Sequence, residues 1–407
     1  MNFSATFISF KNRNFSLFFF GQFVSRIGMW MQRTAVIWVV YTITHSAFMI
    51  GVATFAEQFP SFLFSIRGGI IADKYDRYKV ILLTQILSAL QAIVLTIFAF
   101  AGNYHIGLIL GLSVFLGIVN AYDVPVRQSM MNEIIEEKEH LPNAIALNSS
   151  LNTLARLIGP ALSGFVLAAY GADYCFLSNA VSFVAVIGAI AAMRYPKIDV
   201  INSSIKSRGN FKAAVGYLKE HKPIATVIFI AALSSFFVFS YITLLPVYAK
   251  DIFKGDAQTF GWLNSAMGVG AVAGSFYIAN LRGAANFRKV LLASTFLSGV
   301  SLLLFAYCHN FYLSLFFTAL GGFSSVGQSS IVVTIVQTET DAAFRGRVIS
   351  FIVMAMFGML PIGSLLVGYL APVLGASLTL FSQGIIAILI GTVYYKNLTA
   401  TTGNTKQ

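Results

Sequence analysis

The amino-acid sequence predicts an all-α membrane protein with twelve transmembrane helices arranged as two six-helix lobes. Hydrophobic residues make up 57% of the 407 residues and charged residues only 10%, whereas soluble domains carry about a quarter charged residues. The apolar residues form many runs close to the roughly 20 residues that an α-helix needs to cross a bilayer. Lys and Arg residues fall almost entirely into every second connection between these runs.

Twelve apolar runs define the individual spans. We expect them at residues 15–43, 46–66, 80–101, 106–127, 143–169, 173–193, 224–248, 258–280, 289–308, 311–335, 347–371 and 376–395. Alternate connections then hold 22 of the 27 Lys and Arg residues, and the opposite loops hold only Lys250 and Lys254. By the positive-inside rule, this asymmetry predicts that both termini are cytoplasmic. It also accounts for the net charge of +12 without a nucleic-acid partner.

One long polar connection divides the chain. We expect residues 1–193 to form an N-terminal lobe, 194–222 a cytoplasmic linker, and 223–407 a C-terminal lobe with a short cytoplasmic tail. Within the linker, residues 211–218 are compatible with an amphipathic surface helix. In each half an acidic loop precedes a helix rich in glycine and proline, at an offset of about 200 residues, as in the parallel repeats of two-lobed transporters.

Residues 68–80 concentrate charge between two apolar runs. Two carboxylates and three cations lie within the seven residues 73–79. Because such charges are too costly in hydrocarbon, this stretch must be a short polar hinge. Its pattern, G-x-x-x-A-D-x-x-[GD]-R-x-[KR], resembles the loop between helices 2 and 3 of major facilitator superfamily transporters.

Four further motifs narrow the resemblance to one branch of that superfamily. They are Gly28–Arg33, Asp123–Gln128, Leu141–Ser149 and Ala155–Gly164. Together they are similar to the branch that holds the bacterial enterobactin exporter and related drug and macrolide efflux permeases. The resemblance implies the major facilitator fold, alternating access by two rocking lobes, proton antiport, a monomer and a bacterial inner membrane.

Two residues depart from the family pattern. Asp76 stands where the broad superfamily has glycine, and Glu57 stands where relatives often carry an uncharged amide. The second departure puts a simple transfer of the relatives' substrates in doubt.

The resemblance also implies a gate at the cytoplasmic end of the helices. Arg77 would pair with Asp123, and Asp73 would cap the N-terminus of helix 11. These contacts would hold the gate closed and break on the inward swing, although a static salt-bridge cluster is the alternative. The residues expected in the gate are Gly69, Asp73, Arg77, Asp123 and Arg127.

Four ionisable side chains lie well inside the predicted spans, all in the first half: Arg26, Arg33, Glu57 and Arg156. Ionisable groups at bilayer depth mark a transport pathway by default. We expect Glu57 to pair with an arginine, with Arg26 at a similar depth. Either the pair is permanent and locks two helices together, or Glu57 exchanges partners or protons during transport.

Helical spacing groups these charges with other polar residues. Gln22, Arg26, Met29 and Arg33 share one face of the first span, and Asn148, Asn152 and Arg156 share one face of the fifth. Three arginines against one glutamate predict an anionic substrate, since guanidinium groups bind carboxylates by paired hydrogen bonds. Trp30 either stacks on the substrate or fills the lobe. The expected substrate-binding residues are Gln22, Arg26, Trp30, Arg33, Asn148, Asn152, Arg156, Tyr241 and Gln328.

The fifth span contains a second motif. Gly159, Pro160 and Gly164 resemble the antiporter motif of superfamily exporters, in which proline and glycine give a bendable, tightly packed helix crossing. This motif favours export over uptake.

Other classes of function lack their sequence signals. The chain contains no Walker loop, no nucleophile–base pair and no metal-ligand spacing, so we expect neither an enzyme nor a cofactor or metal. We expect proton-coupled export of a siderophore-like or amphiphilic anionic molecule. Multidrug or macrolide efflux, and uptake of a siderophore, are alternatives. A non-transporting membrane receptor would need neither the polar faces nor the hinge.

Overall fold

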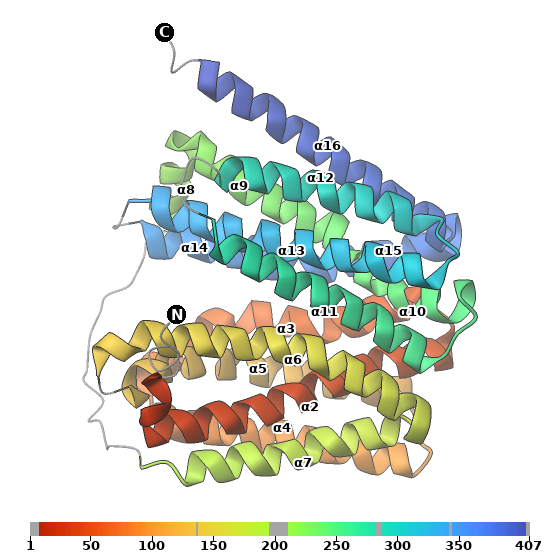
Figure 1. Ribbon diagram of the computed structural model, residues 1–407. Helices are drawn as coiled ribbons and strands as arrows, with labels where there is room; N and C mark the ends of the chain where they lie inside the picture. The colour runs from red at the N-terminus through yellow and green to blue at the C-terminus, as the bar shows by residue number, and fades with distance from the viewer. Residues whose placement is uncertain (1–7, 136, 195–210, 282–286, 342–343, 404–407) are drawn as a thin grey trace. The chain divides into compact units, whose positions relative to one another are not determined.

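The computed structural model describes residues 8–135, 137–194, 211–281, 287–341 and 344–403, and all regular elements in these ranges are helical (Figure 1). The predicted all-α class is therefore confirmed. Each predicted span of the first half coincides with one long helix. These are α2 (Arg13–Thr44), α3 (Ala47–Lys74), α4 (Arg77–Phe100), α5 (Ile106–Ile134), α6 (Leu141–Tyr170) and α7 (Ala172–Ala191).

The second half has the same number of predicted spans, but two of them are irregular helices. The first of these is divided into α9 (Lys222–Leu233), η3 (Ser234–Val238), η4 (Phe239–Leu244), α10 (Leu245–Val247) and η5 (Tyr248–Ile252). The second is divided into α14 (Arg345–Val353), η7 (Met354–Gly358) and α15 (Met359–Leu374). Segments η3, η5 and η7 are π-helical, and η4 is a 3₁₀-helix. The regular helices are α11 (Ala257–Ala279), α12 (Phe287–Ala306), α13 (Phe311–Glu339) and α16 (Ala376–Gly403).

Three short elements complete the described chain. They are η1 (Ile8–Lys11), η2 (Lys138–His140) and α8 (Phe211–Glu220). Helix α8 is the helix expected within the linker, and residues 195–210 of that linker lie outside the described residues.

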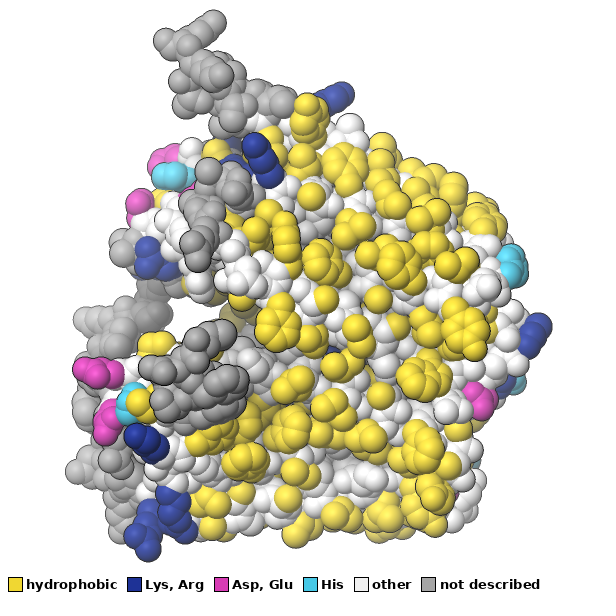
Figure 2. Space-filling view, viewed as in Figure 1, with side chains coloured by type: hydrophobic (Ala, Val, Ile, Leu, Met, Phe, Trp, Pro, Cys, Tyr) yellow, Lys and Arg dark blue, Asp and Glu magenta, His cyan; other side chains and the backbone are white. Residues whose placement is uncertain are grey.

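Ten helices of the described chain are long and apolar enough to cross a membrane. Helices α2 and α11 have 32 and 23 residues and are also long enough. They fall below the hydropathy of the other spans because α2 carries three arginines and α11 is rich in glycine, serine and amides. On the face seen in Figure 2, hydrophobic side chains cover the middle of the helices and charged side chains gather at their ends.

Contacts divide the chain into two units. The first contains residues 1–43 and 56–204, and the second contains residues 44–55 and 205–407. In the first unit, α4 packs between α5 and α7. In the second, α13 packs against both α11 and α12, and α16 packs on α12. The lobe boundaries at residues 193 and 223 stay a prediction.

Polar side chains and glycines set the helix ends. Asp76 accepts hydrogen bonds from the backbone N–H groups of Tyr78 and Lys79, which fixes the start of α4 just after the charged hinge. Gly171 and Gly375 adopt positive φ angles of 94° and 85°, a region that favours glycine, and each joins two consecutive helices. They occupy equivalent places in the two halves, in agreement with the weak internal repeat.

A chain of amides holds three helices of the first unit together. Gln32 Nε2 on α2 donates to Gln91 Oε1 on α4 at 3.1 Å, and Asn179 Nδ2 on α7 donates to Gln32 Oε1 at 2.8 Å. All three side chains are at most 3% exposed. Hydrogen bonds between buried side chains satisfy polar groups that have no water to pair with. These three linked amides therefore fix the register of α2 within the bundle.

Candidate functional site

Trp30 on α2 lies close to two arginines. The guanidinium carbon of Arg33 is 5.2 Å from the centre of the Trp30 ring, and that of Arg156 on α6 is 5.3 Å away. Both distances are within the roughly 6 Å at which a cation is attracted to an aromatic ring. Trp30, Arg33 and Arg156 thus form one cationic aromatic cluster, which we call the Trp30 cluster.

The close approach of α2 and α6 builds this cluster. A Cβ atom at Gly159 would overlap the Cβ atom of Trp30 and lie 3.2 Å from the carbonyl oxygen of Ile27. One turn further along α6, Ser163 Oγ donates to the carbonyl oxygen of Met31 at 3.0 Å. The small residues of the predicted antiporter-like motif therefore serve this crossing, and Pro160 and Gly164 are buried beside them.

Glu57 on α3 adds the acidic group. Its Oε2 atom is 3.4 Å from Arg33 Nε, and the two side chains are 21% and 27% exposed. The expected pairing of Glu57 with an arginine is present, but the partner is Arg33 and not Arg26. Arg26 lies seven residues away from Arg33, about 10 Å along the helix axis, so α3 cannot bring Glu57 to both.

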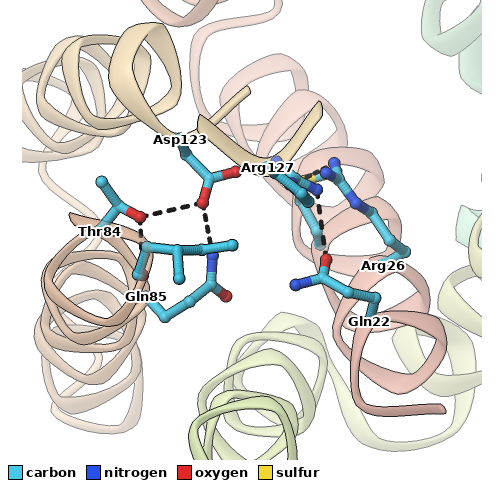
Figure 3. A network of polar contacts seen from close by, with 8 residues as sticks. Gln22, Arg26, Thr84, Gln85, Asp123 and Arg127 are labelled. Carbon is cyan, nitrogen blue, oxygen red and sulfur yellow. Dashed lines mark hydrogen bonds and ion pairs between the residues drawn. The ribbon is translucent and has the colours of Figure 1, made fainter. Parts of the chain in front are cut away.

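A second polar centre lies deeper in the same unit, around Asp123 on α5 (Figure 3). Asp123 Oδ1 accepts hydrogen bonds from Thr84 Oγ1 at 3.0 Å and Gln85 Nε2 at 2.7 Å, both on α4. Its other oxygen pairs with Arg127 one turn along α5. Arg127 Nη1 in turn donates to Gln22 Oε1 on α2 at 3.2 Å.

The polar residues expected on one face of the first span divide between this centre and the Trp30 cluster. Gln22, Arg26 and Met29 line a pocket with Asp123 and Arg127, as helical spacing predicts for the three, whereas Arg33 lies with Trp30 and Glu57. Sequence reasoning missed the partners on α4. Their signal is a polar face at helical spacing, formed by Thr84, Gln85, Ser88 and Gln91.

Arg77 contacts a different acid from the one expected. It pairs with Glu133 near the end of α5, donates from Nε to the carbonyl oxygen of Ala72 at 2.8 Å, and lies 4.0 Å from Asp73. The predicted Arg77–Asp123 pair is wrong for this structure, because Thr84, Gln85 and Arg127 already occupy both Asp123 oxygens. Burial raises the pKa of Glu133, and the neighbouring charge of Arg77 opposes that rise.

Two adjacent glycines of the hinge stretch differ in their surroundings. A Cβ atom at Gly68 would lie 2.9 Å from the carbonyl carbon of Ala121 and 3.1 Å from Pro125 Cγ, both on α5. A Cβ atom at Gly69 would meet nothing within 4 Å. The close approach of α3 to α5 therefore depends on Gly68.

The remaining predicted site residues do not join either centre. Asn152 on α6 is exposed and donates to the carbonyl oxygen of Asn148 at 2.8 Å. Tyr241 and Gln328 are each 3% exposed inside the second unit, where Gln328 Nε2 donates to Ser298 Oγ at 3.1 Å. Both thus pack against their own unit. Among the described residues, no group of His, Cys, Asp and Glu is placed to hold a metal ion.

Comparison with known proteins gives a family match over nearly the whole chain. The sequence profile of the family described as transmembrane secretion effector matches residues 4–406. Three bacterial relatives are similar over most of their length. The staphyloferrin A transporter of Staphylococcus aureus is 28% identical over 93% of this chain and 94% of its own. Macrolide efflux protein A of Streptococcus pyogenes is 22% identical over 94% and 96%. The enterobactin exporter EntS of Shigella flexneri is 25% identical over 92% and 90%.

Solved structures agree with this match at the level of the fold. A transporter of the POT family, crystallised with 5-aminolevulinic acid, superposes with a TM-score of 0.74. It covers 94% of this chain and 95% of its own at 12% sequence identity. At that identity the likeness concerns the major facilitator fold alone, which the sequence predicts.

Proposed function

This chain belongs to the transmembrane secretion effector family of major facilitator transporters, and we propose that it exports a siderophore-like or amphiphilic anionic molecule in exchange for protons. As a multi-pass transporter of this superfamily it is not an enzyme. The enterobactin exporter and the staphyloferrin A transporter among its relatives support the class of substrate. The bacterial relatives and the Lys and Arg asymmetry support an inner membrane with both termini cytoplasmic.

The Trp30 cluster is the observation that carries the proposal. It offers an aromatic ring with two guanidinium groups close to it, and one of the two, Arg156, contacts no carboxylate among the described residues. A planar carboxylate can accept paired hydrogen bonds from such a guanidinium, while an apolar or aromatic part of the same molecule packs on Trp30. Amphiphilic anions combine these two features.

Glu57 is the proposed coupling residue. It shares Arg33 with the Trp30 cluster, so an anion that binds Arg33 competes with the Glu57 carboxylate. Substrate binding and proton binding would thereby be linked through one guanidinium, whereas a permanent Arg33–Glu57 pair would leave them independent.

The hinge residues Gly69, Asp73 and Arg77, with Asp123 and Arg127, are proposed as the gate. The Arg77–Glu133 pair joins α4 to α5, and Arg77 also contacts Asp73 and the carbonyl oxygen of Ala72 at the end of α3. The Asp123–Arg127 pair lies within α5. The gate would open by breaking the first of these pairs, which is the less buried.

A test uses the purified protein in liposomes under a set pH gradient, with an internal pH indicator. A citrate-type siderophore and a cationic dye are added separately to wild type, Glu57→Gln, Arg156→Gln and Arg13→Gln. Arg13 is exposed at the start of α2, so its substitution is the matched control. We expect the siderophore alone to trigger proton movement, Glu57→Gln to abolish it, and Arg156→Gln to weaken the apparent affinity roughly 10–100-fold, the loss of a charge-assisted contact.

The same assay decides between the proposal and its runner-up. Macrolide efflux protein A is also a relative, so efflux of cationic or neutral drugs is the second candidate. Proton flux triggered by the dye and not by the siderophore would refute the anionic substrate. Wild-type coupling in Glu57→Gln, with lowered thermal stability, would make the Arg33–Glu57 pair structural.

A further inference from the structure

The pocket around Asp123 shares no lining residue with the Trp30 cluster and is lined by the first unit alone. Its lining side chains come from α2, α4, α5 and α7. The polar groups that line it include Gln22, Ser25, Arg26, Gln85, Asp123 and Arg127. The structure therefore has a second polar site, distinct from the Trp30 cluster, in which two of the proposed gate residues, Asp123 and Arg127, lie.

Two buried donors in this pocket have no partner. Gln22 Nε2 and Arg127 Nε are fully shielded and make no hydrogen bond in the described structure. Their side chains belong to residues that are only 2% and 7% exposed. An unpaired buried N–H group is costly, and both of these groups lack an acceptor, not a donor.

The charges of the lining residues also indicate that a hydrogen-bond acceptor is missing from the pocket. Asp123 is the only acid among the lining residues, and it is already bound to Arg127, Thr84 and Gln85. The side chains that α4 and α7 contribute are neutral. Arg26 contacts the sulfur of Met29 at 3.7 Å, which is a poor acceptor. One formal positive charge is thus left without a carboxylate at membrane depth, where charge is expensive.

We propose that this pocket binds one small monovalent anion, either a halide or a single carboxylate group, between Arg26, Gln22 and Arg127. Figure 3 shows the guanidinium groups of Arg26 and Arg127 close together, with the amide oxygen of Gln22 turned toward Arg127. An anion supplies the acceptor that the two unpaired N–H groups lack and neutralises the charge of Arg26. A water molecule would satisfy the donors but leave the charge, and a cation would meet two guanidinium groups.

Thermal unfolding of the purified full-length protein in detergent tests this site. Sodium gluconate is replaced stepwise by chloride, bromide, nitrate or formate at constant ionic strength. A ligand that binds the folded state raises the Tm with the logarithm of its concentration once its site is saturated. We expect such a rise for the small anions in wild type, and a loss of apparent affinity of at least about tenfold in Arg26→Gln.

Three further variants and one measurement make the result specific. Arg26→Lys should retain part of the effect, Gln22→Leu should weaken it, and Arg156→Gln, which changes the Trp30 cluster, should keep it. Crystals grown with bromide should show an anomalous peak between Arg26 and Arg127. A response to halides assigns the site to free anions, and a response only to carboxylates assigns it to a carboxylate group.

The proposal is overturned if no anion shifts the Tm beyond the gluconate control, or if Arg26→Gln responds like wild type. Water would then fill the pocket. The measurement needs neither a transported substrate nor a pH gradient. Its failure would leave the proposed transport function standing, and failure of the transport assay would leave this site standing.

Discussion

Gly68 and Gly69 are adjacent in sequence, yet the structure predicts opposite effects for the same substitution. In Gly68→Ala the new methyl group would lie 2.9 Å from the carbonyl carbon of Ala121 and closer still to its oxygen. Because the obstacle is backbone, a side-chain rotation cannot relieve it, and α3 must move away from α5. Inserting one carbon into a packed interior costs about 1–3 kcal/mol.

In Gly69→Ala the methyl group enters open space. Replacing glycine by alanine inside a helix stabilises it by roughly 0.5–1 kcal/mol. Both variants share this gain, so they should differ by the steric cost at Gly68, about 1–3 kcal/mol.

Thermal unfolding of the two purified variants in one detergent measures this difference. One kcal/mol corresponds to about 2–4 °C in Tm for 150–250 residues, so we expect Gly68→Ala to unfold several degrees below Gly69→Ala. Equal Tm values, or a lower Tm for Gly69→Ala, would refute the close contact between α3 and α5 at Gly68.

Two further predictions concern buried polar groups. Burial raises the pKa of Glu133, so its contribution to stability is complete below the unfolded pKa and is lost as pH rises through the folded pKa. The Tm of wild type should fall relative to that of Glu133→Gln from acidic to neutral pH, and parallel curves would contradict this. Gln32→Leu leaves Gln91 and Asn179 unpaired, at about 1–3 kcal/mol each; an unchanged Tm would show that the amide chain does not hold α2.

The helices were predictable because each apolar run is bounded by polar or glycine residues close to a helix end. Asp76 and Gly171 illustrate this, since both signals are local and both fix a terminus in the structure. The Asp123–Arg127 pair joins residues four apart on one helix, which are neighbours, although the resemblance implied that Asp123 pairs with Arg77. The family and its fold likewise followed from short motifs in the expected order.

Partners on different helices were harder to predict. The choice of Arg33 over Arg26 depends on the position of α3 along α2. That position follows from how α3 packs as a whole, including its contact with α5, where Ser61 Oγ donates to the carbonyl oxygen of Gly117 at 2.7 Å. The predicted span ends at residue 127, which leaves Glu133 in the loop that follows. Helix α5 continues to Ile134 and carries Glu133 to Arg77. Such long-range packing has no local signature.

Tyr241 lies in an irregular part of its span. The π-helical turn η3 and the 3₁₀ segment η4 change the number of residues per turn before and around it, so the direction of its side chain cannot be counted at 3.6 residues per turn. In the structure it is buried near Gly321 of α13.

The π-helical turns also set how each unit tolerates a change in chain length. A π turn contains one residue more than the α-helical turn it replaces. Deleting one residue within Ser234–Val238 can be absorbed by converting η3 into an ordinary turn, with the rest of the helix left in register. Helix α2 contains no π turn, so it has no extra residue that could compensate for such a deletion. A one-residue deletion before Trp30 would rotate every later residue of α2 by about 100° and turn both Trp30 and Arg33 away from their present neighbours.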